Sequence, residues 1–187
     1  MKNAILMGLI IFLGHSLLAQ SIPFRLTNHN NIVIKAILNK QDTVNLMLHT
    51  GATDIMLIED VLPKLKSINF SGKVDSVGSW GGGNNTSDFS VKNSIKIGDF
   101  DFQNITVWKD KYSGPETDGK FGISLFEKKI LAFDFDKNLL NITEKLPKKL
   151  KKYQKFEIKN ERGLVFLKAV CRVANNDFEK EFMIHSG

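Results

Sequence analysis

The sequence contains a single cysteine, Cys171, among its 187 residues. One cysteine excludes a disulfide framework, and it also excludes a metal site built from several cysteines. No cysteine follows the apolar run at the N-terminus, so a lipoprotein anchor has no point of attachment. The glycine-rich stretch GGGNN lacks the Gly-Lys-Ser/Thr ending of a phosphate-binding loop. These absences exclude several common classes of small exported or nucleotide-binding protein.

The first 19 residues have the features of a secretory signal peptide. Lys2 supplies the positive start, residues 4–18 are apolar, and Ala19 is a small residue suited to cleavage. A membrane anchor is the alternative, but the run contains His15 and is short for a bilayer span of about 20 residues. We therefore expect residues 1–19 to be removed. The mature protein would then be periplasmic or secreted, with no membrane association.

Lysine is concentrated in one short run, KLPKKLKKYQK, over residues 145–155, and the formal net charge of the chain is +6. Such a run can bind an anionic surface or nucleic acid, or it can be a solvated linker. Pro147 interrupts the run, and no nucleic-acid-binding motif accompanies it. We favour the linker and expect no nucleic-acid partner.

Short β-branched and aromatic runs alternate with turn residues through most of the chain. This period of two, with Gly, Asn and Asp between the runs, predicts a mostly β architecture. Gly98-Asp99 suits a hairpin turn, and residues 59–65 and 122–128 each suit one short helix. The clearest strand runs are residues 31–39, 44–49, 54–58, 90–98, 102–108, 129–135 and 139–143.

The chain contains an internal repeat. Residues 31–51 and 164–187 both run from an apolar strand through Lys-Ala to a second apolar strand and then to His-Thr-Gly or His-Ser-Gly. A repeated unit that ends in the same unusual tripeptide predicts two equivalent lobes. We assign residues 20–148 to a first lobe, 149–155 to a basic linker, and 156–187 to the first strands of a truncated second lobe.

Four segments, in this order, carry a family resemblance: LMLHTGAT (46–53), SWGGGNNTSDF (79–89), the stretch 118–142 with its Phe-Gly pair and short helix, and FMIHSG (182–187). The chain resembles the retropepsin-like and pepsin-like aspartic proteases, specifically the exported bacterial aspartyl-protease type. The resemblance implies an acid-protease-like closed β-barrel lobe with one or two short helices, plus the start of a second equivalent lobe.

The resemblance also implies a site. In the family, an Asp-Thr/Ser-Gly loop from each lobe supplies one catalytic carboxylate, and a glycine-rich flap hairpin covers the substrate. In this chain both aspartate positions are histidine. The dyad-equivalent catalytic positions are His49, Thr50, Gly51, His185, Ser186 and Gly187, and the flap positions that would contact substrate are Trp80, Gly81, Gly82 and Gly83.

Histidine at both positions changes the chemistry that the resemblance implies. The two aspartates of the family share one proton, because like charges about 3 Å apart cannot both ionise. Two imidazoles lack the negative charge that activates water, and loss of general-base help costs on the order of 10² to 10⁴ in rate. We therefore expect no ordinary aspartic proteolysis.

Three functions remain open from the sequence. The first is an exported aspartyl-protease-like protein without peptidase activity that binds a peptide, protein or polymer in the cleft between lobes. The second is a hydrolase that uses the His dyad, and the third is a non-functional fragment of a longer two-lobed homologue. In the third case the incomplete second lobe would either join the first lobe's sheet or drive oligomerisation or aggregation.

No cofactor or metal is expected. Imidazole suits Zn, Cu or Ni, but His49 and His185 are two ligands, which is too few for a closed tetrahedral site. His29 is available in the polar loop TNHNN, where we expect it to be exposed.

Overall fold

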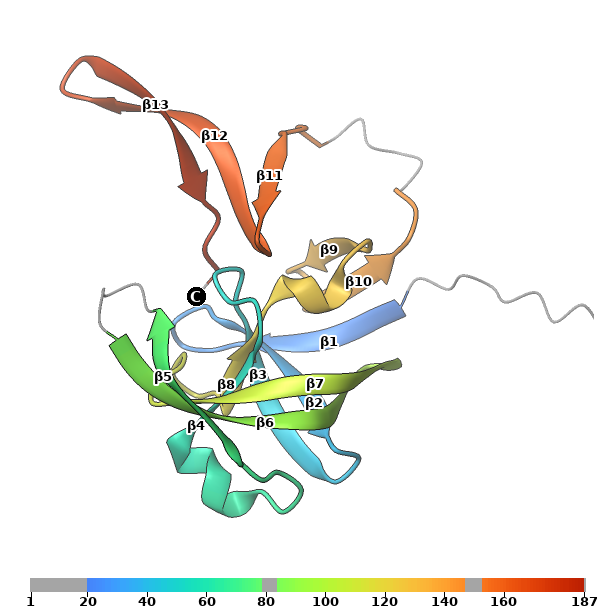
Figure 1. The fold of residues 1–187 in the computed structure, drawn as a ribbon. Coiled ribbons are helices and arrows are strands. Elements are labelled where there is room, and N and C mark those ends of the chain that lie inside the picture. Colours follow the sequence, from blue (N-terminus) through green and yellow to red (C-terminus); the bar gives the residue numbers. More distant parts are fainter. Residues whose placement is uncertain (1–19, 79–83, 147–152, 187) are drawn as a thin grey trace, which may run out of the picture.

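A computed structural model describes residues 20–78, 84–146 and 153–186 (Figure 1). The predicted signal peptide, the four predicted flap residues 80–83 and the glycine at position 187 lie outside these described residues. None of the helices in the described part of the chain is long and apolar enough to cross a membrane.

Two separate sheets account for nearly all of the regular structure. A ten-stranded sheet holds the first lobe, and a three-stranded sheet holds the C-terminal residues. The first sheet contains β1 (Gln20–Leu26), β2 (Ile32–Leu38), β3 (Asp42–Leu48), β4 (Ile55–Ile58), β5 (Gly72–Gly78), β6 (Asn84–Ile97), β7 (Phe100–Asp110), β8 (Gly119–Phe121), β9 (Ile130–Asp134) and β10 (Leu139–Thr143). The second contains β11 (Ile158–Glu161), β12 (Leu164–Val173) and β13 (Asn176–Met183).

The first lobe closes into a barrel. The strand order β7-β4-β8-β3-β2 is completed into a ring because β2 also pairs with β6, which pairs with β7. Two of the pairings, β3–β8 and β4–β7, are parallel, and the other pairings of this ring are antiparallel. The predicted mostly β fold with a closed barrel is therefore confirmed.

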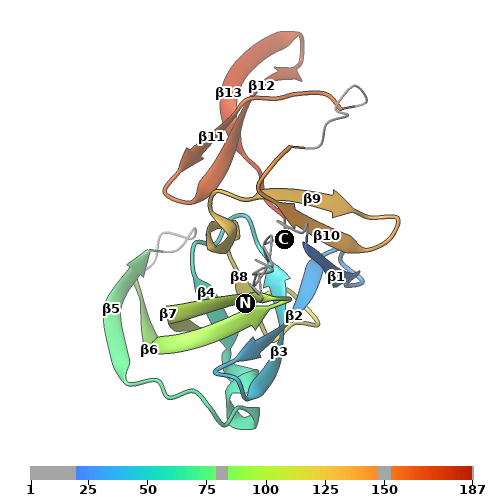
Figure 2. The same cartoon turned by 90° about the vertical axis from the view of Figure 1, so that its right-hand side faces the viewer.

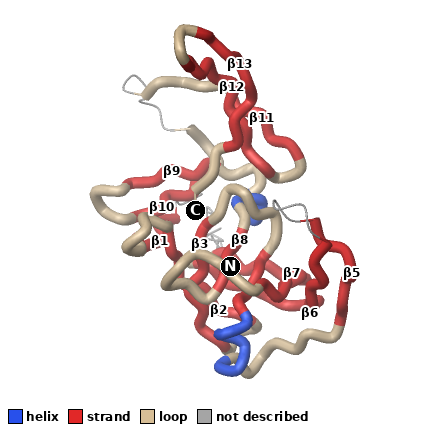
Figure 3. The backbone as a smooth tube through the Cα atoms, turned by 90° about the vertical axis from the view of Figure 1, so that its left-hand side faces the viewer, coloured by secondary structure: helices blue, strands red, loops and turns tan. Residues whose placement is uncertain are grey.

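In the described part of the chain, helix is limited to two short 3₁₀ segments, η1 (Glu59–Lys64) and η2 (Ile123–Phe126) (Figure 3). Both fall inside the two stretches predicted to form short helices. The predicted hairpin turn is also present: Ile97 pairs with Phe100, and Gly98 between them has φ of 58°. Glycine accepts this left-handed conformation without a Cβ penalty.

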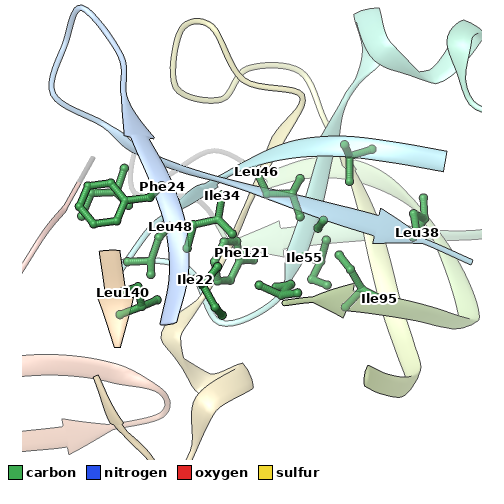
Figure 4. Packing of buried hydrophobic residues seen from close by; sticks show 14 of the residues in the cluster. Ile22, Phe24, Ile34, Leu38, Leu46, Leu48, Ile55, Ile95, Phe121 and Leu140 are labelled. Atoms are coloured by element: carbon green, nitrogen blue, oxygen red, sulfur yellow. The ribbon is translucent and has the colours of Figure 1, made fainter. Parts of the chain in front are cut away.

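Strand alternation explains the core. Along β2 the side chains of Ile34, Ala36 and Leu38 are buried while Lys35 between them is exposed. Equivalent positions of β3, β4 and β6 fill the barrel, and Phe121 at the end of β8 lies at its centre with no exposed surface (Figure 4). Leu48, the last residue of β3, belongs to this core, so His49 directly follows a buried residue.

The strand predictions missed four elements and shortened a fifth. β1, β5, β8 and β11 were not among the predicted runs, and β6 begins six residues before the predicted run at residue 90. The N-terminal part of β6, NNTSDF, is polar because it pairs with the edge strand β5 and is not a core strand. Polar edge segments carry little alternation for a sequence to reveal.

The three-stranded sheet, which we call the arm, extends away from the barrel (Figures 1 and 2). Within the described residues, no arm strand pairs with a strand of the first sheet, so the arm does not extend that sheet by strand addition. Residues 153–157 lead into β11 without regular structure and are exposed. The predicted lobe and linker boundaries stay predictions.

Replacement of Phe121 by alanine tests the core. We expect Phe121→Ala to lower the free energy of unfolding by about 3–5 kcal/mol, because a fully buried ring is replaced by a cavity. Urea unfolding followed by circular dichroism measures the change. The control Tyr112→Ala removes an exposed ring and should alter stability by no more than about 0.5 kcal/mol. Equal losses for the two variants would contradict this assignment of the core.

Candidate functional site: a paired histidine site

Two loops form the site, and each follows the end of a strand. His49 comes directly after β3, and its N–H donates to the carbonyl of Phe121 at 2.9 Å. The carbonyl of His49 accepts from Ala52 N–H at 3.0 Å, which closes a tight turn. On the arm, Ile184 N–H donates to the carbonyl of Val165 at 2.8 Å and directs the chain after β13 toward the first loop.

The two loops are joined by four reciprocal hydrogen bonds. The N–H of Thr50 donates to Ser186 Oγ at 3.1 Å, and the N–H of Ser186 donates to Thr50 Oγ1 at 3.0 Å. Each hydroxyl in turn donates to a carbonyl on the opposite loop, Thr50 Oγ1 to Ile184 at 2.6 Å and Ser186 Oγ to Leu48 at 3.1 Å. The pattern has approximate two-fold symmetry, because Leu48 and Ile184 are the residues that precede the two histidines.

The hydrogen bonds bring His49 and His185 into contact. Their ring centroids lie 4.5 Å apart, and the ring planes are nearly perpendicular at 83°. Gly51 lies against both rings: a Cβ at this position would be 2.8 Å from Cε1 of His49 and 3.0 Å from Cδ2 of His185. A side chain at position 51 would therefore force the rings apart.

The environment of His49 keeps its ring neutral. Burial is the largest cause, followed by the charges of His185 and Lys120, and together they lower the pKa of His49 from 6.5 to about 4. The N–H of Gly51 donates to Nδ1 of His49 at 3.1 Å. Because Nδ1 accepts this bond, the neutral ring carries its proton on Nε2.

The lysine whose charge acts on His49 belongs to a salt bridge. Lys120, on β8, lies with its Nζ 2.7 Å from a carboxylate oxygen of Asp110 at the end of β7. Its ammonium group still disfavours a second positive charge on His49. Within the described residues, no group of three or more His, Cys, Asp or Glu side chains is placed to hold a metal ion.

An open cavity of about 490 Å³ lies beside His185. The sequence predicted His29 to be exposed, and it is exposed in the structure, where it lies at this cavity. Sequence reasoning missed the other wall residues, because they come from the β1–β2 loop, the first residue of β2 and the residue after β9, and the two groups are about 100 positions apart. The cavity is lined by His29, Asn30, Asn31, Ile32, Phe135, His185 and Ser186.

The loop that carries His29 has a defined conformation. The hydroxyl of Thr27 is buried and accepts from the N–H groups of His29 at 3.2 Å and Asn31 at 3.1 Å. Asn30, between them, has φ of 63°, a conformation that asparagine tolerates better than most residues. The Thr-x-x-Asn spacing is a local signal for such a turn, but it does not reveal that the turn faces His185.

The predicted flap is only partly described. β5 and β6 pair antiparallel up to Gly78 opposite Asn84, so they flank residues 79–83 on both sides. Trp80 and the three glycines at 81–83 lie outside the described residues, as does the glycine at 187. Their predicted roles stay predictions.

Comparison with known proteins supports a relation of this chain to the aspartyl protease family. Residues 34–125, just under half of the chain, match a family model described as aspartyl protease. The matched segment contains the His49 loop and ends before the arm. No curated protein matches the chain. Among solved structures, a retropepsin-like aspartic protease from Rickettsia conorii is 24% identical, with a TM-score of 0.46 over 66% of this chain and 90% of that chain.

Substitution of Thr50 tests the reciprocal hydrogen bonds. Thr50→Val keeps the shape of the side chain but removes an acceptor for Ser186 N–H and a donor to the carbonyl of Ile184. We expect residues 184–186 to detach from the Thr50 loop more often, because the free energy that opposes detachment falls by about 1–3 kcal/mol. Hydrogen exchange of the Ser186 amide measures this directly. Thr43→Val, on the exposed side of β3, is the matched control, and equal exchange in both variants would refute the assignment.

The lowered pKa of His49 predicts a pH dependence of stability. The unfolded chain takes up the proton near pH 6.5 and the folded chain only near pH 4, so stability from neutral His49 is complete above pH 6.5 and is lost as pH falls toward 4. The loss is at most about 3 kcal/mol. Urea unfolding at several pH values should show a weaker pH dependence for His49→Gln than for His29→Gln or the wild-type protein. The same slope in all three would contradict the burial of His49.

Proposed function

We propose that the protein is an exported aspartyl-protease-like protein that retains the paired-loop scaffold of the family, lacks ordinary aspartic peptidase activity, and binds peptides beside the paired histidines. The observation that carries this proposal is the reciprocal Thr50–Ser186 hydrogen bonding around two imidazoles. The family match over residues 34–125 supports the same scaffold for the His49 loop. Export rests on the N-terminal pattern of residues 1–19.

The protonation of His49 argues against peptide hydrolysis by the aspartic mechanism. That mechanism needs one ionised carboxylate to take a proton from water and one protonated carboxyl group to donate to the carbonyl. His49 is neutral above about pH 4, and its only lone pair in the ring plane already accepts from Gly51 N–H. The ring therefore offers a donor at Nε2 but no free base for water.

The cavity beside His185 suits an extended peptide. Asn30 and Asn31 have amide side chains that can donate and accept, as the alternating N–H and C=O groups of a peptide backbone require. Ile32 and Phe135 give the cavity an apolar wall for a side chain. The other lining residues are polar, so hydrogen bonds would fix the orientation of a bound peptide backbone.

The proposal is tested with a mixed peptide library incubated with the purified protein from pH 3 to pH 7. We expect no cleavage products by mass spectrometry, a subset of peptides retained intact on the immobilised protein, and no binding of statine-type inhibitors. Cleavage that disappears in His49→Ala would overturn the proposal and would assign a hydrolase that uses the His dyad. If the immobilised protein retains no peptide, the proposed peptide binding is wrong.

A double substitution separates the chemistry from the scaffold. His49→Asp with His185→Asp restores two carboxylates to loops that keep their hydrogen bonds, so we expect weak acid proteolysis to appear when the double variant is made in a complete two-lobed version of the chain. His29→Asp with His185→Asp is the matched control, because it adds the same two charges but leaves His49 in place. A folded double variant without activity on any peptide would show that the remainder of the cleft has also diverged from the family.

A further inference from the structure

The arm has two chemically different faces. Residues opposite each other in an antiparallel pair point to the same side, so the pairs Ile158–Leu167, Leu167–Phe182 and Cys171–Phe178 define one side. Lys180 is the only charged side chain that the register places on that side. We call this side the apolar arm face, and it consists of Ile158, Asn160, Val165, Leu167, Ala169, Cys171, Val173, Asn176, Phe178, Lys180 and Phe182.

The opposite side of the arm is a solvated, ion-paired face. Its charges are matched across the strands, with Lys159 3.1 Å from Glu181 and Lys168 2.9 Å from Glu179. Near the tip of the hairpin, Arg172 forms two hydrogen bonds with Asp177, at 2.6 and 2.9 Å. Because these charges are paired with one another and solvated, the ion-paired face requires no external partner.

The apolar arm face is exposed along most of its length, and it is buried only at Val165, near the barrel. Ile158 is 60% exposed, Val173 56%, Phe178 48% and Phe182 43%. The arm contacts the barrel at one end, at Ser186 and near Gly163, and its sheet extends away from the barrel toward the β12–β13 turn (Figures 1 and 2). A sheet with one apolar side normally packs that side against a second layer.

We propose that the apolar arm face is a self-association surface, and that a second copy of this chain covers it with the same face in a two-fold, sheet-on-sheet pair. We choose a second copy as the partner because the apolar arm face has almost no charge. A face with a single lysine on each copy can meet itself without strong repulsion, as a two-fold interface requires, and it offers nothing to attract a highly charged partner.

The size of the face sets the strength of the association. β12 has 10 residues, β13 has 8 and β11 has 4. At about 3.4 Å per residue and about 4.8 Å between strands, the flat footprint is roughly 350 Å² per copy, and the side chains that stand above the sheet add to it. The flat footprints of two copies sum to roughly 700 Å², which is below the standard size of specific interfaces before the side chains are added, so we expect a weak, reversible dimer in the micromolar range or above.

Self-association through the arm leaves the paired histidine site intact. The hydroxyl and N–H groups of Thr50 and Ser186 are bonded to each other within one chain, so a second copy is not needed to complete these loops. The dimer therefore does not depend on the proposed peptide-binding function, and either can fail alone.

Sedimentation velocity of the purified full-length product, with its N-terminus established by mass spectrometry, tests the proposal from micromolar to millimolar concentration. We expect the mean mass to rise toward twice that of the monomer. Phe178→Lys, a change at an exposed position of the apolar arm face, should abolish the rise. Val170→Lys is the matched control, since Val170 is 60% exposed but lies on the ion-paired face opposite Glu179.

Alkylation of Cys171 supplies an independent measurement. Cys171 is free and exposed, and it lies beside Phe178 on the apolar arm face. Its reaction with a small maleimide should slow several-fold as the protein concentration rises, except in Phe178→Lys. A monomer at all concentrations, equal association of the two lysine variants, or a concentration-independent alkylation rate would overturn the proposal. Binding of a monomer to anionic lipid vesicles would instead assign the face to a lipid surface.

Discussion

The hydrogen bonds between Thr50 and Ser186 are the interaction on which the site and the position of the arm depend. They connect residues 136 positions apart, and each hydroxyl both accepts from an N–H and donates to a carbonyl of the other loop. The barrel holds its half of this arrangement rigidly, because His49 N–H is bonded to the carbonyl of the fully buried Phe121. The arm is held at its end by the same bonds, and its strands then extend into solvent.

The geometry of the loops and the chemistry of the side chains they present are separable. The reciprocal bonds use only the backbone and the hydroxyls of positions 50 and 186, so they tolerate a change of residue at positions 49 and 185. In the family these positions require one negative charge, whereas here burial and a neighbouring imidazole favour no charge at all on His49. The positive charge of Lys120 also opposes protonation of His49. The site therefore disfavours a charge at a position where a carboxylate dyad carries one.

The sequence was most informative where a pattern repeats or alternates. The two tripeptides at 49–51 and 185–187 could be matched because each follows an apolar strand, and β2 and β3 could be predicted from alternation. β5 and the polar start of β6 could not, because an edge hairpin needs no apolar side. The cavity wall formed by Asn31 and Phe135 depends on long-range pairing of β1 with β10, for which the sequence carries no local signal.

Nitrogen-15 NMR of the histidine side chains tests the central account most directly. The account requires a neutral His49 with its proton on Nε2 at pH 7, an Nδ1 that accepts from Gly51, and titration near pH 4. It also requires a Ser186 amide that exchanges slowly while His49 stays neutral. A His49 ring that titrates at its ordinary value near 6.5, with a rapidly exchanging Ser186 amide, would contradict the paired-loop scaffold.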